Sequence, residues 1–380
     1  MARVLVLGGG FGGVSAAQQL RLLGPEHEVV LVARSSHFMM GFRKNSELVG
    51  GEPMESGRRP LAALEERGIR FVQGTIERFD PAARAVEVEG QTLQGDAVVV
   101  ALGAEVVADA VPGLAEHALN FYDPAVVPEA AEALRSLREG RVAVGIFGAP
   151  YTCPPAPYEA ALLASEASEE RGDRVEFAAF TPQPMSLPIL GRTGCEVVEG
   201  RLGLRGIRFM PNAKAESVED GLVRFEGGGE EPFDVLLAVP PHRCPRVLVD
   251  AGLAEPGGWV RVDARTLETP FDGVSAIGDC TAIPLATGMP LPKAGVLAEG
   301  EGRVVAERIL ARLNGIQPEA TFDGEGACYL EVGGGQAMMV RGRFLAEPAP
   351  DVTLTEASPR YLQDKADYER QRLEEWFGPA

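Results

Sequence analysis

The chain has 380 residues, a formal net charge of −19 and an apolar fraction of 45%, so it is long and apolar enough for two domains. Because an acidic surface repels a phosphate backbone, nucleic acid is not expected as a partner. No apolar run reaches the roughly 18 residues of a membrane-spanning helix. A strand-like run, Arg3–Leu7, stands where a signal peptide would begin. We therefore expect a cytoplasmic protein.

Cysteine and histidine usage argues against a metal site. The chain has four histidines, and its five cysteines form no C-x-x-C pair, so no zinc site is expected. In a reducing compartment, a disulfide between any of these cysteines is expected to be catalytic and not structural. The cysteines are Cys153, Cys195, Cys244, Cys280 and Cys328.

Strand-like and helix-like patterns alternate along the chain, which predicts an α/β protein with parallel sheets. The expected strands are Arg3–Leu7, Glu28–Ala33, Ala97–Leu102, Arg141–Phe147, Val175–Ala179 and Val235–Val239, followed by a β-like stretch around Cys328. The expected helices are Gly13–Leu23, Gly295–Leu313 and the charged segment Arg360–Phe377.

The order of these elements predicts two Rossmann-like domains and a small C-terminal α+β segment. The first domain is expected to be discontinuous, with residues 1–105 and 255–315, because its signals return from Gly258 onward. Residues 106–254 are expected to form the second domain. Residues 316–380 are expected to form the C-terminal segment, which carries Cys328.

A glycine-rich loop follows the first strand. Gly8, Gly10 and Gly13 form G-x-G-x-x-G between a strand and a helix, the context in which this pattern predicts a dinucleotide site. The glycines allow a tight turn and bring a pyrophosphate close to the helix N-terminus. The acidic residue that often closes the second strand is replaced by Ala33, followed by Arg34, which is also typical of an NADP site. The loop alone therefore leaves the choice of dinucleotide open.

Two further motifs favour FAD. Ala276-Ile277-Gly278-Asp279 resembles the late FAD motif of flavoprotein disulfide reductases, and Val98–Gly103 resembles their strand-and-glycine motif. The resemblance implies that Asp279 accepts a hydrogen bond from the flavin ribityl chain, a role suited to a carboxylate, which only accepts when it is ionised. An ordinary turn aspartate is the structural alternative. Three motifs in the expected order predict bound FAD.

The second domain lacks a nicotinamide loop. After its first strand the chain reads Gly145–Glu159 (GIFGAPYTCPPAPYE), in which four prolines and Cys153 interrupt the glycine pattern. Proline offers no backbone N–H to a phosphate, so a second pyrophosphate site is poorly supported.

Four segments together resemble the sulfide:quinone oxidoreductases and the flavin subunit of flavocytochrome c sulfide dehydrogenase. They are Thr152–Glu159 (TCPPAPYE), Val239–His242 (VPPH), Leu291–Gly295 (LPKAG) and Gly326–Tyr329 (GACY). The resemblance extends over about the whole chain and places Cys328 where the family has its second redox cysteine. It implies a Cys153–Cys328 redox pair beside the flavin.

Roles for the residues near this pair follow from the resemblance. Cys153 precedes a helical pattern from Ala156, and a helix N-terminus is expected to lower its pKa. Glu159 is a candidate proton relay or simply an acid at a helix start. Lys293 is expected to face the flavin pyrimidine, where negative charge develops on reduction. A small packed residue remains the alternative for either cysteine of the pair.

The chain also departs from the family pattern. Residues 104–152 contain no third catalytic cysteine, and Phe38–Val49, where flavocytochrome-type members attach flavin, contains none either, so FAD is expected to be non-covalent. The tail Arg360–Phe377 is densely charged, which favours at most weak peripheral contact with membranes.

The leading hypothesis is an FAD-dependent oxidoreductase that passes two electrons from sulfide or a small thiol to FAD and on to a quinone or another acceptor, such as a redox protein. A homodimer is possible. An NAD(P)H-dependent flavin oxidoreductase and a non-catalytic flavoprotein subunit remain as alternatives.

Overall fold

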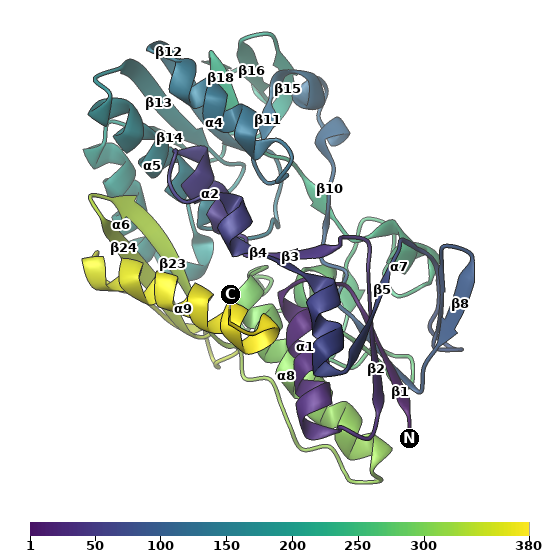
Figure 1. Cartoon of the computed structure of the whole chain (residues 1–380). Coiled ribbons are helices and arrows are strands. Elements are labelled where there is room, and N and C mark those ends of the chain that lie inside the picture. Colours follow the sequence, from purple (N-terminus) through teal and green to yellow (C-terminus); the bar gives the residue numbers. More distant parts are fainter. Residues whose placement is uncertain (380) are drawn as a thin grey trace.

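Two five-stranded parallel sheets dominate the computed structural model, which describes residues 1–379 (Figure 1). Valine-rich runs such as AVVV form continuous buried strands because helices and loops cover both faces. The first sheet takes strands from both ends of the chain. Its order is β21 (Val274–Ala276), β9 (Ala97–Val100), β1 (Arg3–Leu7), β2 (Glu28–Ala33) and β5 (Ile69–Gln73).

The second sheet is also parallel, and three longer helices connect its strands. Its order is β11 (Leu119–Asn120), β18 (Val235–Val239), β12 (Glu139–Ile146), β13 (Arg174–Phe180) and β14 (Arg208–Met210). The helices are α4 (Val127–Ser136), α5 (Ala156–Glu170) and α6 (Gly191–Leu204).

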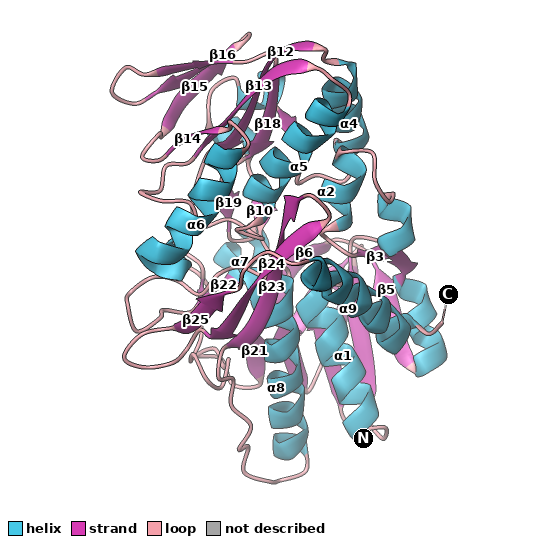
Figure 2. Cartoon of the chain, turned by 90° about the vertical axis from the view of Figure 1, so that its left-hand side faces the viewer, coloured by secondary structure: helices cyan, strands magenta, loops and turns pink. Residues whose placement is uncertain are grey.

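Helices α1 (Phe11–Leu23) and α8 (Gly295–Leu313) pack side by side on the first sheet (Figures 1 and 2). The packing is close because small residues meet there: a Cβ added to Gly302 would lie 2.6 Å from the carbonyl oxygen of Gly12. Gly295, the first residue of α8, lies against the ring of Phe11, so α8 begins next to the glycine-rich loop.

The C-terminal segment lies across both halves of the molecule. It forms the antiparallel sheet β23 (Glu325–Gly333), β24 (Gln336–Arg343) and β25 (Asp351–Leu354), followed by α9 (Pro359–Phe377), drawn in yellow in Figure 1. Strand β23 contacts α5 as well as α8. Near the end of α9, the ring of Trp376 packs edge-on against Phe11 and Phe38.

Shorter elements connect these layers. The short helices are α2 (Arg43–Leu48), α3 (Leu114–His117) and α7 (Arg246–Asp250). Two three-stranded antiparallel sheets are β6 (Ile76–Asp80), β7 (Ala85–Val88) and β8 (Gln91–Gln94), and β15 (Ala215–Glu219), β16 (Leu222–Phe225) and β17 (Glu230–Pro232). Two-stranded pairs are β3 (His37–Met39) with β4 (Arg58–Pro60), β10 (Glu105–Val106) with β19 (His242–Arg243), and β20 (Val260–Arg261) with β22 (Thr281–Ala282).

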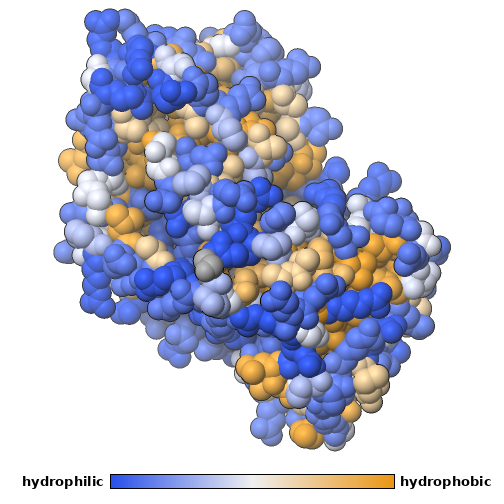
Figure 3. All heavy atoms as spheres, in the orientation of Figure 1, coloured by the Kyte–Doolittle hydropathy of each residue, from blue (hydrophilic) through white to orange (hydrophobic). Residues whose placement is uncertain are grey.

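The α/β fold expected from the sequence is confirmed. Strands β1, β2 and β18 and helix α8 have the expected bounds, whereas α1 begins at Phe11, two residues before the expected start. The earlier start arises because the extended residue Gly10 already serves as the N-cap. Most of the face in Figure 3 is hydrophilic, and among residues 1–379 no helix is long and apolar enough to cross a membrane.

Candidate active site

The glycine-rich loop has the geometry that a bound dinucleotide requires. Gly8 has a φ of +118°, and a Cβ there would lie 2.0 Å from the carbonyl oxygen of Ala101. A Cβ on Gly13 would lie 1.9 Å from the carbonyl oxygen of Gly8, so both positions need glycine. A Cβ on Gly10 would meet nothing within 4 Å, and no side chain caps the start of α1. The helix N-terminus is thus open to a pyrophosphate, and these residues fit FAD.

The later motifs lie at the carboxyl ends of neighbouring strands of the first sheet. Gly103 follows β9 with a φ of +68°, and Gly278 follows β21 with a φ of +71°. The half-buried carboxylate of Asp279 accepts no hydrogen bond from the described residues. Burial raises the pKa of Asp279 to about 6, while Lys293 opposes the rise. Arg34 is exposed directly after β2.

One cavity of about 220 Å³ brings together all four candidate catalytic residues. Cys153, Cys328, Glu159, Asp279 and Lys293 all line it, although they come from distant parts of the chain. Phe11 and Gly295 line it as well, which places the starts of α1 and α8 at its edge. The cavity therefore lies between the expected cofactor motifs and the cysteine pair.

The loop that carries Cys153 is held by hydrogen bonds to its neighbours. The backbone N–H of Cys153 donates to the carbonyl oxygen of Lys293 at 2.7 Å, and the hydroxyl of Tyr122 donates to the carbonyl oxygen of Cys153 at 3.1 Å. Cys153 has a φ of +50°, which is unusual for a residue other than glycine. The surrounding contacts hold this backbone so that the thiol is accessible from the cavity.

Both cysteines of the expected pair are free thiols in this structure, and their surroundings raise the pKa of each. Burial, followed by the charge of Glu159, raises the pKa of Cys153 to about 11. Burial, followed by Cys153, raises the pKa of Cys328 to about 12. The expected lowering of the Cys153 pKa was wrong in its net direction. The N–H of Ala156 at the start of α5 does lower it, but burial and Glu159 outweigh that contribution.

A buried cluster of charges lies beside the cysteines. Glu159, near the start of α5, accepts hydrogen bonds from the ammonium of Lys365 at 3.1 Å, the amide of Asn45 at 3.1 Å and the backbone N–H of Glu331 at 2.9 Å. Lys365 also lies 2.7 Å from the carboxylate of Glu331. The two carboxylates raise the pKa of Lys365, whereas burial raises the pKa of Glu159. The buried charges of Glu159 and Lys365 therefore compensate each other.

Sequence reasoning missed Lys365 and Lys44, which also line the cavity. The chain contains only four lysines, and three of them, Lys44, Lys293 and Lys365, lie here. The ammonium of Lys44 donates to the carbonyl oxygen of Tyr122 at 2.9 Å. No single sequence motif predicts that these lysines meet at the cavity, because Lys44 precedes Cys153 by more than a hundred residues.

The side chain of Lys293 contacts the turn that carries Asp279. Its ammonium donates to the carbonyl oxygens of Asp279 at 2.6 Å and Thr281 at 3.1 Å, and it lies 3.5 Å from the ring centre of Trp259. Burial lowers its pKa, while Asp279 opposes this. Lys293 thus ties the Cys153 loop, through its backbone, to the turn that carries Asp279.

His242 contacts Thr152, the residue that precedes Cys153 in its loop. Its Nε2 lies 3.2 Å from the hydroxyl of Thr152, and its Nδ1 lies 2.8 Å from the carbonyl oxygen of Pro240. Burial lowers the pKa of His242 to about 4, so the ring is neutral near pH 7. The remaining cysteines, Cys195, Cys244 and Cys280, are buried and do not line the cavity.

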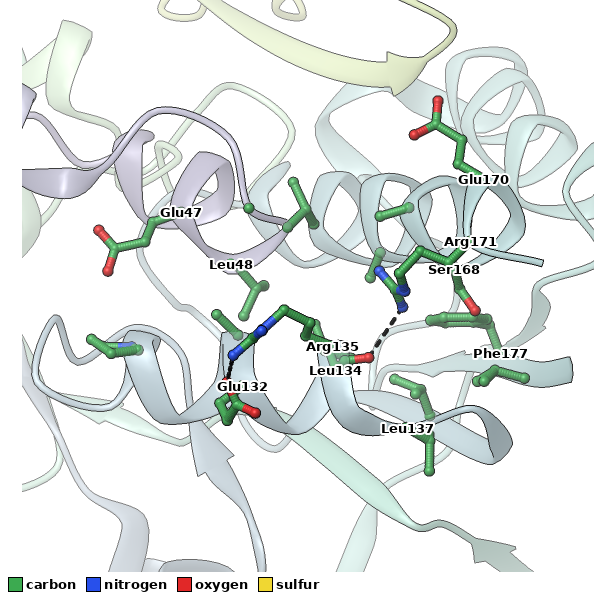
Figure 4. Close-up of a pocket in the computed structure, with 18 residues that line it drawn as sticks. Glu47, Leu48, Glu132, Leu134, Arg135, Leu137, Ser168, Glu170, Arg171 and Phe177 are labelled. Atoms are coloured by element: carbon green, nitrogen blue, oxygen red, sulfur yellow. Dashed lines mark hydrogen bonds and ion pairs between the residues drawn. The ribbon is translucent and has the colours of Figure 1, made fainter. Parts of the chain in front are cut away.

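A second cavity of about 550 Å³ lies between α2, α4 and α5 (Figure 4). Leu48, Leu134, Leu137 and Phe177 give it apolar walls, and none of the expected catalytic or cofactor-binding residues lines it. Within residues 1–379, no group of three or more His, Cys, Asp or Glu side chains is arranged to hold a metal ion.

Known proteins share both this fold and much of the sequence pattern. Residues 2–302 match the family described as pyridine nucleotide-disulphide oxidoreductase. The chain is 23% identical to the mitochondrial sulfide:quinone oxidoreductase of Mus musculus, over 99% of this chain and 88% of that protein. It is 27% identical to the sulfide-quinone reductase of Aquifex aeolicus (strain VF5), over 81% and 76%.

A solved structure has the same fold as this chain. The sulfide:quinone oxidoreductase from the hyperthermophilic bacterium Aquifex aeolicus matches with a TM-score of 0.90 at 24% identity, covering 99% of this chain and 92% of that one. The family resemblance and the FAD cofactor expected from the sequence are confirmed. The chain belongs to the pyridine nucleotide-disulphide oxidoreductase family, and it is an FAD-dependent oxidoreductase similar to the sulfide:quinone oxidoreductases.

Proposed function

We propose that this enzyme oxidises sulfide, or a similar small thiol, at Cys153 and Cys328 and delivers two electrons through FAD to a quinone or another acceptor. One observation carries the proposal: both cysteines line a single cavity together with three of the four lysines of an acidic chain. Hydrosulfide is an anion, so clustered ammonium groups favour its entry into a site that the overall charge of −19 would otherwise disfavour.

The chemistry of the pair is thiol–disulfide exchange. Hydrosulfide attacks one sulfur of a Cys153–Cys328 disulfide, and a new sulfur–sulfur bond forms between the substrate and that cysteine. The bond between the two cysteines breaks, and the other sulfur leaves as a thiolate that keeps the electron pair. Glu159 is the proposed proton carrier, because it is buried beside Cys153 and its protonation state is linked to Lys365.

FAD is proposed to lie along the motifs found in the first domain. Gly8, Gly10 and Gly13 would admit the pyrophosphate to the start of α1, and Asp279 would accept a hydrogen bond from the ribityl chain. When bound, FAD supplies a two-electron acceptor for the reduced cysteine pair and a donor to the final acceptor. Lys293, fixed between Asp279 and the Cys153 loop, is proposed to position both parts of the site.

A quinone suits the aromatic part of the cavity. Phe11, Phe42 and Tyr368 line it, and flat aromatic walls favour a planar ring. The names of the relatives above, sulfide:quinone oxidoreductases, support the same acceptor class. The alternative, an NAD(P)H-dependent flavin oxidoreductase, is disfavoured because Pro154, Pro155 and Pro157 leave few backbone N–H groups at the start of α5.

Anaerobic titration of the purified holoprotein tests the proposal. Sulfide is expected to bleach the oxidised flavin absorbance stoichiometrically, whereas NADH and NADPH are expected to leave it unchanged over the same time. Addition of a water-soluble quinone should then restore the oxidised spectrum. Bleaching by NADH but not by sulfide would overturn the proposal in favour of a nicotinamide-dependent enzyme. Bleaching without turnover of any free acceptor would favour an electron-transfer subunit.

A further inference from the structure

Glu301 is a buried carboxyl group that has no part in the cysteine chemistry. It lies on α8, is 2% exposed, and accepts a hydrogen bond from the backbone N–H of Gly278 at 2.5 Å. Gly278 and Asp279 form the turn that follows β21. Glu301 therefore supports, from inside the domain, the turn that is proposed to hold FAD.

Among residues 1–379 Glu301 forms no ion pair, and the one cation whose charge opposes the rise of its pKa is Lys293. The nearest ammonium, on Lys293, donates to two backbone carbonyl oxygens instead. On α8 itself, Glu299 and Arg303 pair with each other. A negative charge on Glu301 would thus be buried with a single backbone N–H as its hydrogen-bond partner.

Two ionisable groups face Glu301, the ammonium of Lys293 and the carboxyl group of Asp279, and the second has the same sign as Glu301. Asp279 approaches from the turn after β21, and Gly278, Asp279, Lys293 and Glu301 surround one small cavity of about 10 Å³. Two neighbouring carboxyl groups do not ionise independently, and the more buried one keeps its proton longer. Consistent with this geometry, burial raises the pKa of Glu301 to about 8; Asp279 adds to the rise, and the N–H of Gly278 and the charge of Lys293 oppose it.

We propose that Glu301 is protonated in the holoenzyme and that its ionisation weakens FAD binding, so that a residue outside the cofactor motifs makes cofactor retention dependent on pH. The inference rests on the proposed placement of FAD beside Gly278 and Asp279. Ionised Glu301 would add a second negative charge next to Asp279 and close to the site of an anionic cofactor. The repulsion would be relieved by movement of the turn or by release of FAD.

The expected size follows from linkage. If only the protonated form binds FAD well, the dissociation constant rises by about tenfold between about pH 7 and pH 9, given a pKa of about 8. The experiment measures rebinding of FAD to the apoprotein by flavin fluorescence across this range. Glu301→Gln keeps an acceptor for the Gly278 N–H without the charge, and its dissociation constant is expected to change less than about twofold.

Glu307→Gln is the matched control, because Glu307 is exposed on the same helix and should leave the wild-type profile unchanged. A flat wild-type profile would overturn the proposal, and so would a Glu301→Gln profile equal to that of the wild type. If Glu301→Gln does not refold with FAD, infrared spectra of the wild-type holoprotein decide. Loss of a protonated-carboxyl band at alkaline pH together with FAD release supports the proposal, and release without that loss contradicts it. Either outcome is independent of whether sulfide or NADH reduces the flavin.

Discussion

Replacing Lys365 by methionine tests how much the buried ion pair between α9 and Glu159 contributes to stability. The Lys365 side chain is 7% exposed, and its ammonium lies 3.1 Å from Glu159 and 2.7 Å from Glu331. The Glu159 side chain is 4% exposed. Methionine keeps the unbranched apolar stem that packs near Phe42, so the substitution removes the charge and little of the packing.

The expected loss of stability is about 3–5 kcal/mol at about pH 8, because removal of one partner leaves Glu159 as an uncompensated buried charge. Lys365 lowers the pKa of Glu159 against the effect of burial, so that pKa rises further in the variant. Protonation then relieves the unpaired charge as the pH falls. The loss of stability should therefore shrink towards about pH 5.

Urea unfolding of the holoprotein at the two pH values, followed by flavin release and tryptophan fluorescence, measures the difference. Lys214→Met is the matched control, because Lys214 lies 2.7 Å from Glu226 with both side chains more than half exposed. That surface pair should contribute less than about 1 kcal/mol. Equal losses for both variants would refute the argument, and so would a Lys365→Met loss that grows in acid.

Four further outcomes are expected. Cys153→Ser and Cys328→Ser should each abolish flavin reduction by sulfide and retain FAD, whereas Cys195→Ser, whose buried sulfur already donates to a backbone carbonyl, should react normally in stopped-flow measurements. Glu159→Gln should lower the pKa of Cys153, since the carboxylate raises it, and alkylation rates of the Cys153 peptide against pH measure the shift. His242, with a pKa lowered to about 4, should show no NMR titration between about pH 6 and pH 8. Acid precipitation should release all flavin into the supernatant, and flavin left on the protein would contradict non-covalent binding.

The parts of the fold that the sequence predicted well share one physical property. Strands β1, β2 and β18 are continuous apolar runs because both of their faces are buried. Their bounds can therefore be predicted from the order of apolar and polar residues alone. Helix α8 has the expected bounds because Pro292 precedes it and Asn314-Gly315 follows it. Local chemistry determines these elements, and tertiary contacts do not alter them.

The contribution of α9 could not be read in the same way. Its buried side chains are Lys365, Glu369, Leu373 and Trp376, which follow one face of the helix at spacings of four, four and three residues. Half of that face is charged, so the pattern resembles a solvated helix in any hydropathy profile. The charges are buried only because partners from elsewhere meet them: Arg43 pairs with Glu369 at 2.7 Å, and Glu159 pairs with Lys365. The sequence shows the spacing of these residues, but it does not show that Arg43 and Glu159 lie beside them in the fold.

The lysines of the cavity bear on how an acidic protein would accept the anionic substrate proposed above. At physiological ionic strength, exposed charges are screened over about 8 Å, so most surface carboxylates contribute little inside the cavity. Lys44 and Lys293 are hydrogen-bonded to backbone carbonyl oxygens, which do not cancel their charge, whereas Lys365 is paired with two carboxylates. The positive charges that act on Cys153 are those of Lys44 and Lys365, and the one that acts on Cys328 is that of Lys365. Burial lowers the pKa of Lys44, whereas Glu159 and Glu331 raise that of Lys365, so the contribution of Lys44 is the first to weaken as the solution becomes alkaline.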